Sequence, residues 1–185
     1  SQENFNTIFQ LAKKSKFINN DFDFDVAKKL YPLDVLSAIV LTGAIQRYGQ
    51  NERSLFSFLH SKDKNSLTNF EPNATQTYNL ANVYDYIIYN FHSYLSEVNA
   101  DSANWRAIRV ALERIEALFD TEEVESASKI VKVIGLCNLF GSTATFDDKS
   151  LSVYLQLALN IEYPEYLIGQ LVAHKIIRFA KYKSQ

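Results

Sequence analysis

Residues 31–49 read YPLDVLSAIVLTGAIQRYG and contain the longest nearly apolar stretch of the chain. One helical face carries apolar residues at the required spacing: Leu33, Leu36, Val40, Ala44 and Ile45. Further apolar residues cover most of the remaining circumference, which is typical of a helix in the centre of a core. Pro32 suits the first turn of this helix, and Gly49 suits its end.

The segments on both sides of this central helix also favour helices. Apolar residues recur at helical spacing near residues 5–12, 80–95 and 105–119. We expect Asp23 or Asp25 to cap a short helix that ends at Leu30. Asn79 is expected to cap the helix over residues 80–95. The acidic run 120–125 is expected to close the third of these helices.

Residues 52–60 predict another helix, with Asn51 as its cap. Its buried face is expected to consist of Leu55, Phe56, Phe58 and Leu59. The polar segment 61–77 that follows has the composition of a loop.

The last sixty residues predict a different order of elements. The expected elements are a helix over 128–140, a short strand over 142–146 and a helix over 148–160 that Asp147 caps. A helix that begins at Pro164 follows, and then a strand over 177–183, in which apolar and basic residues alternate. This order is that of a winged helix that stops before its returning strand. We therefore predict a mainly α fold with minimal β: a helical bundle subdomain over 1–122 and an incomplete winged-helix-like subdomain over 123–185.

Composition excludes several classes of protein. The chain is 47% hydrophobic and 14% aromatic with a net charge of -2, so it is not intrinsically disordered. Five Gly and one Cys exclude collagen-like chains and disulfide scaffolds. The sequence begins at Ser1 and contains no Met, which leads us to expect a piece of a larger protein.

The chain is expected to be cytoplasmic, without a membrane partner. Its longest apolar stretch is much shorter than the roughly 20 residues that span a bilayer. No basic and apolar leader segment is present in this sequence. Cys137 lies in an apolar run and is expected to be a buried residue in a reducing compartment.

No catalytic or metal-binding pattern is found. None of the five glycines precedes a lysine as a phosphate-binding loop requires. His60, His92 and His174 lack ligand partners at metal-binding spacing, and the apolar neighbours of Cys137 argue against a nucleophilic thiol. We expect no catalytic residue, metal or cofactor in this chain.

Two polar clusters remain as candidate sites. The first consists of Arg47, Gln50, Asn51, Glu52 and Arg53, between two apolar helices. It has two readings: helix termination and capping, or a junction whose arginines contact a phosphate or carboxylate.

The second cluster is a candidate nucleic-acid contact: Gln170, His174, Lys175, Arg178, Lys181 and Lys183. Residues 126–185 carry seven basic and four acidic side chains, whereas residues 65–125 carry three and ten. This charge distribution permits nucleic acid at the C-terminal end without predicting it. Winged helices also dock proteins, so both partners stay open.

Several short motifs along the chain together resemble one family of proteins. They are Tyr31-Pro32-Leu33, the run from Gln50 to Leu59, the Tyr84-Asp85 pair, Trp105 and the run from Lys132 to Leu139. The family is the large bacterial P-loop ATPases often found near phage-defence genes, of the ORC/STAND-like kind. The resemblance covers about residues 28–182. This part of the chain is similar to the helical and winged-helix-like region that follows the ATPase core in those proteins. It implies that the phosphate-binding motifs, with ATP and Mg²⁺, belong to flanking sequence of a parent ATPase. It also implies a nucleotide-sensing or core-holding role for Arg47 or Arg53.

The leading hypothesis is therefore a non-catalytic fragment of a larger bacterial ATPase. Such a fragment couples nucleotide state to a nucleic-acid or protein partner, and its first partner is the remainder of the parent ATPase. The alternatives are a DNA-binding winged-helix regulator and a helical protein-interaction module. An autonomous enzyme is disfavoured because no catalytic constellation is found.

Overall fold

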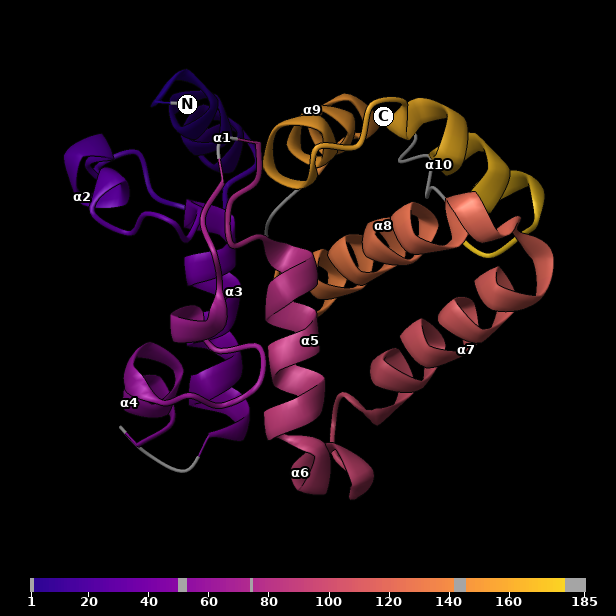
Figure 1. Ribbon diagram of the computed structural model, residues 1–185, viewed down its shortest axis with the longest axis horizontal. Helices are drawn as coiled ribbons and strands as arrows, with labels where there is room; N and C mark the ends of the chain where they lie inside the picture. The colour runs from indigo at the N-terminus through magenta and orange to yellow at the C-terminus, as the bar shows by residue number, and fades with distance from the viewer. Residues whose placement is uncertain (1, 50–52, 74, 142–145, 179–185) are drawn as a thin grey trace, which may run out of the picture.

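The computed structural model describes residues 2–49, 53–73, 75–141 and 146–178 (Figure 1). Across these ranges the chain forms ten α-helices and one 3-10 helix, and no strand. The helices are α1 (Gln2–Lys14), α2 (Phe24–Lys28), α3 (Val35–Tyr48), α4 (Arg53–His60), α5 (Leu80–Asn90), α6 (His92–Ser96), α7 (Ser102–Leu118), α8 (Thr121–Phe140), α9 (Asp148–Leu159) and α10 (Pro164–Ala173), with the 3-10 helix η1 (Leu67–Asn69). The mainly α prediction is confirmed. None of the described helices has the length and apolarity that crossing a bilayer requires.

Side-chain caps explain where several helices begin. Asp23, Asn79 and Asp147 cap α2, α5 and α9, as the sequence predicts. The prediction that Pro32 lies in the first turn of the central helix is wrong. Asp34 caps α3 instead, because its Oδ1 accepts a hydrogen bond from the Ser37 amide at 2.8 Å.

Three further boundaries differ from the sequence prediction. The acidic run 120–125 begins α8 and does not close α7; carboxylates near a helix N-terminus are favoured by the helix dipole. The helix expected over 80–95 is divided between α5 and α6. In the two predicted strands, residues 142–145 and 179–183 lie outside the described residues, and Phe146, Ile177 and Arg178 form no strand. The winged-helix detail therefore stays a prediction.

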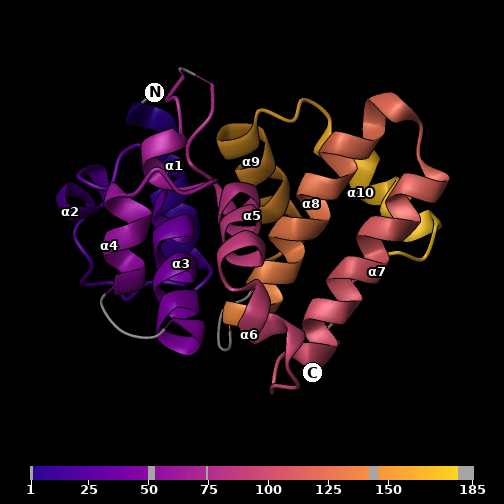
Figure 2. The same cartoon turned by 60° about the horizontal axis from the view of Figure 1, so that its bottom comes forward.

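The helices pack around α3, α5 and α8. α3 lies beside α5, α8 crosses both, and α7 lies along the outer side of α8 (Figures 1 and 2). α1 packs against α3 and α9, and α10 packs against α8 and α9. One buried cluster contains side chains from both sides of the predicted boundary at residue 122, although the division into two subdomains stays a prediction.

A close approach joins α7 to α8 at Gly135. A Cβ atom placed on Gly135 would lie 2.4 Å from Cδ1 of Ile108 and 2.6 Å from its Cγ1. These distances are far below van der Waals contact, so the missing side chain permits the packing of the two helices. Gly169 in α10 is different, because nothing lies within 4 Å of its Cβ position.

A buried carboxylate joins three parts of the core. Asp34 is completely buried, and its Oδ2 accepts hydrogen bonds from the Thr77 and Tyr154 hydroxyls, both at 2.9 Å. The Tyr154 hydroxyl also accepts one from the Leu80 amide at 3.0 Å. Burial raises the pKa of Asp34, and the hydrogen bonds that stabilise its charged form offset part of that effect.

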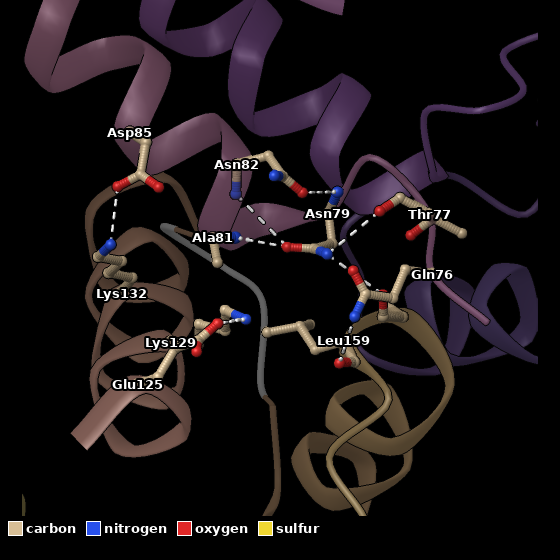
Figure 3. Close-up of polar contacts among 11 residues, drawn as sticks. Gln76, Thr77, Asn79, Ala81, Asn82, Asp85, Glu125, Lys129, Lys132 and Leu159 are labelled. Carbon is tan, nitrogen blue, oxygen red and sulfur yellow. Dashed lines mark hydrogen bonds and ion pairs between the residues drawn. The ribbon is translucent and has the colours of Figure 1, made fainter. Parts of the chain in front are cut away.

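The backbone beside this carboxylate is tied in the same way. The Tyr78 amide donates to the Pro32 carbonyl at 2.8 Å. The Asn79 side-chain amide donates to the carbonyls of Thr77 and Ala158 at 3.1 and 3.2 Å, and its oxygen caps α5 (Figure 3). The N-termini of α3 and α5 and the C-terminal part of α9 therefore form one hydrogen-bonded unit.

We predict opposite effects of alanine at two helical glycines. Gly135→Ala should lower the free energy of unfolding by about 1–3 kcal/mol, because the methyl group overpacks the contact with Ile108. Gly169→Ala should raise it by about 0.5–1 kcal/mol through helix propensity. Urea denaturation of both variants measures the difference, and equal effects at the two positions would contradict the proposed α7–α8 packing.

We also predict that Tyr154→Phe lowers the free energy of unfolding by about 2 kcal/mol, because it leaves the buried Leu80 amide without a partner and removes one of the two hydroxyls that donate to Oδ2 of Asp34. The matched control is Tyr163→Phe, since Tyr163 is 73% exposed. Chemical denaturation should show no change beyond about 0.5 kcal/mol for the control. Equal stability of Tyr154→Phe and the wild type would exclude a stabilising role for this network.

Candidate functional site

Arg47 lies where α3, α7 and α8 meet. Its Nη1 donates to Oδ2 of Asp101 at 3.1 Å and to the carbonyl of Leu139 at 3.2 Å. Its guanidinium carbon lies 4.6 Å from the centre of the Phe140 ring, within the range of a cation–π contact. The last turn of α3 is thereby attached to the start of α7 and to the last turn of α8.

Tyr48 completes this junction from inside. Its hydroxyl donates to Oδ2 of Asp101 at 2.6 Å and accepts from the Trp105 indole at 3.0 Å. Burial and the bond to Asp101 raise the pKa of Tyr48 to about 12. The hydroxyl is therefore neutral at physiological pH and acts as a donor to the carboxylate. We name Arg47, Tyr48, Asp101 and Trp105 the α3–α7 junction.

Three of the motifs that carry the family resemblance contribute residues here: Tyr84-Asp85, Trp105 and Lys132. The ring of Trp105 lies 5.9 Å from that of Tyr84 on α5. Lys132 on α8 lies over the same Tyr84 ring and forms an ion pair with Asp85 at 2.7 Å (Figure 3). Residues far apart in the sequence thus form one continuous set of contacts across α3, α5, α7 and α8.

The first candidate cluster is only partly described. Gln50, Asn51 and Glu52 lie outside the described residues, and Arg53 is the first residue of α4. Their candidate role in contacting nucleotide stays a prediction. Arg47 is the member whose contacts are described, and its guanidinium is held by groups of this chain.

The predicted buried face of α4 is wrong for three of its four residues. Phe58 is completely buried against the rings of Tyr78 and Tyr86. The other three side chains are exposed: Leu55 by 45%, Phe56 by 66% and Leu59 by 38%. α4 contacts only α3 and η1 extensively, so a helix of this composition has more apolar surface than the core covers. We call these three side chains the α4 surface.

The second candidate cluster is divided by the end of α10. Gln170 is half-buried within α10, and the ring of His174 packs 5.4 Å from that of Phe119. Lys175 and Arg178 are exposed, whereas Lys181 and Lys183 lie outside the described residues. Their role in contacting nucleic acid stays a prediction.

Two features near α10 do not favour a polyanion. Arg114 on α7 uses its guanidinium internally, donating to the carbonyls of His174 and Lys175 at 2.8 and 3.1 Å. The charge of Glu123 raises the pKa of Tyr166, which locates the acidic start of α8 beside α10. Carboxylates at this position repel phosphate groups.

Sequence reasoning missed the acidic partners of the site. Asp101 and Asp85 were surrounded by polar loop and helix patterns, and nothing in their spacing identifies Arg47 or Lys132 as partners. Asp34 offers one signal that sequence reading can use: a lone acidic residue two positions after a proline and immediately before an apolar helix. Such a residue is a candidate cap, and in this chain it is also the buried carboxylate.

The two phenylalanines of α4 provide a direct test of its orientation. Phe58→Ala should lower the free energy of unfolding by about 3–5 kcal/mol, because it opens a cavity among aromatic rings. Phe56→Ala removes a mostly exposed side chain and should change stability by less than about 0.5 kcal/mol. Thermal and urea unfolding measure both; a large loss for Phe56→Ala would show that the α4 surface belongs to the core.

The arrangement braces helices and does not surround a reactive group. Among the residues that the structure describes, no three His, Cys, Asp or Glu side chains are grouped as a metal site requires. Burial raises the pKa of the Cys137 thiol to about 12, which leaves it protonated and unreactive at neutral pH. Comparison with protein-family models, curated proteins and solved structures finds no match for this chain.

Proposed function

We propose that this chain is a non-catalytic module of a larger bacterial P-loop ATPase and couples the nucleotide state of that ATPase to a nucleic-acid or protein partner. The observation that carries this proposal is the α3–α7 junction. Arg47 stands three residues before the segment 50–58, which gives the most specific part of the family resemblance. The same arginine is bonded to the start of α7 and the end of α8.

The junction supports coupling because it leaves little freedom between these elements. Asp101 accepts from Arg47 and Tyr48 together, and its carboxylate is only 16% exposed. A charge-assisted bond in a partly desolvated site is stronger than one in water. In this proposal a movement of the last turn of α3 reaches α8 through the bond of Arg47 to the Leu139 carbonyl. α8 has 20 residues and spans about 30 Å towards α10.

The α4 surface supplies a contact for the ATPase core of the same polypeptide. Leu55, Phe56 and Leu59 extend directly from the segment 50–53, so a domain that contacts this segment also reaches them. Covering three exposed apolar side chains is favoured by about 25 cal/mol for each Å² removed from water. In this proposal the core lies against the α4 surface, and Arg53 is the residue that senses its nucleotide.

The proposal requires a phosphate-binding loop in the parent polypeptide. Sequencing the gene that encodes residues 1–185 together with its flanking regions tests this requirement. A P-loop N-terminal to Ser1 in the same reading frame is expected. A complete parent sequence without one would refute the proposal, whatever the role of the arginines.

The two arginines should have separable effects in the parent ATPase. Arg53→Ala should lower ATP hydrolysis by at least about tenfold, because a cation that stabilises transferred phosphate is lost. It should leave the free energy of unfolding of this chain within about 0.5 kcal/mol of the wild type. Arg47→Ala should instead lower that free energy by about 1–3 kcal/mol through the loss of charged hydrogen bonds.

Hydrolysis assays of the parent protein and urea denaturation of residues 1–185 measure these two quantities. Lys29→Ala is the control, since Lys29 is exposed and follows α2, which packs on α1 and contains no residue of either cluster. Normal hydrolysis by Arg53→Ala would assign residues 50–53 to helix capping alone. An unchanged free energy of unfolding for Arg47→Ala would show that the bonds of Arg47 do not stabilise the α3–α7 junction.

A further inference from the structure

α7 lies at the outer edge of the molecule, and within the described residues no helix other than α8 packs extensively on it. Its inner face packs on α8 through Trp105, Ile108 and Ile115, which are at most 6% exposed. Figures 1 and 2 both show α7 at the periphery, with α8 between it and the rest of the bundle. The opposite face carries exposed side chains of the described residues.

This outer face is apolar apart from Arg114, whose guanidinium is bonded to the backbone carbonyls of His174 and Lys175. Val110 is 44% exposed and Leu118 is 47% exposed, and Ala103 and Ala107 are exposed on the same side. The positions 103, 107, 110, 114 and 118 follow steps of three and four residues, which is the spacing of one helical face. A helix that presents alanine and valine allows a second helix to approach closely.

A shallow groove of about 370 Å³ follows this face. Ala107, Val110 and Ala111 line it from α7, and Ile176 forms its wall beyond α10. The wall is fixed because Arg114 donates two hydrogen bonds to the backbone immediately before Ile176. The position of the groove wall is thus set by backbone hydrogen bonds of the folded chain.

The charges beside this groove change sign halfway along the helix. Arg106 and Arg109 lie in the first half, and Glu113 and Glu116 lie in the second half, on the same flank of the helix. Arg109 and Glu113 contact each other only at 3.8 Å, and their side chains are 70% and 66% exposed. An exposed pair of this kind is worth little by itself, so both groups are available to a partner.

We propose that the outer face of α7 binds the same face of a second copy of this chain, with the two α7 helices antiparallel. An antiparallel partner reverses the order of charges, and the two arginines of each copy then lie beside the two glutamates of the other. Val110 lies within one residue of the two-fold axis, which passes at the midpoint of the four charges, between Arg109 and Glu113. A parallel arrangement would oppose arginine to arginine and glutamate to glutamate. This interface extends beyond the proposed coupling function and does not depend on it.

The interface is small, and the dimer is correspondingly weak. A helix of 17 residues is about 26 Å long, so the contact buries less area than a standard stable interface. We expect a dissociation constant on the order of ten micromolar or weaker, with tighter association at low salt because the flanking charges are exposed.

Charge reversal tests the proposal in solution. In sedimentation equilibrium of residues 1–185, Arg106→Glu combined with Arg109→Glu should weaken dimerisation at least about tenfold, because both flanks become wholly acidic. Adding Glu113→Arg and Glu116→Arg should restore the dimer, since the reversed pattern is again complementary to itself. A monomeric wild type at several hundred micromolar, or a failure of the four-fold variant to regain association while it remains folded, would overturn the proposal.

Cysteine cross-linking tests the antiparallel geometry. Val110→Cys should form a disulfide-linked dimer under mild oxidation by copper phenanthroline, because the two copies of residue 110 lie beside the axis. Ala103→Cys lies on the same face, but in this geometry its two copies are about 24 Å apart and should not link. The wild type controls for Cys137, whose raised thiol pKa leaves it unreactive. Linking at both positions, or at neither, would contradict antiparallel pairing.

Discussion

The buried carboxylate of Asp34 is the constraint on which the rest of the structure depends. A charge without solvent is tolerated only when donors surround it, and here a backbone amide and two hydroxyls do so. These donors come from α3, from the segment before α5 and from α9, which are more than 40 residues apart along the chain. Satisfying one carboxylate therefore fixes how three separate parts of the sequence meet.

This constraint determines what the other end of α3 can do. With its N-terminus held at Asp34, α3 directs Arg47 and Tyr48 towards Asp101 and the last turn of α8. Asp85 and Lys132 join α5 to α8 nearby (Figure 3). A helix fixed at both ends transmits a displacement better than one that can rotate. The coupling role that we propose rests on this rigidity and not on a reactive side chain.

The sequence predicts the helices better than it predicts their partners. Apolar spacing locates α1, α3, α5 and α7, and short polar side chains identify the caps of α2, α5 and α9, because both signals are local. The orientation of α4 is not local: of its four large apolar residues only Phe58 is buried, and it packs on Tyr78 and Tyr86, which come from the segment before α5 and from α5. The same holds for Arg47, since its partners come from segments 54 and 92 residues away.

Hydrogen–deuterium exchange of the parent ATPase tests the coupling role most directly. The measurement compares the protein bound to ADP with the protein bound to a non-hydrolysable ATP analogue. We expect the exchange of residues 135–140, in the last turns of α8, to differ between the two states, and Arg47→Ala to abolish that difference while preserving the one at residues 53–60. Identical exchange of residues 135–140 in both nucleotide states of the wild type would contradict the account.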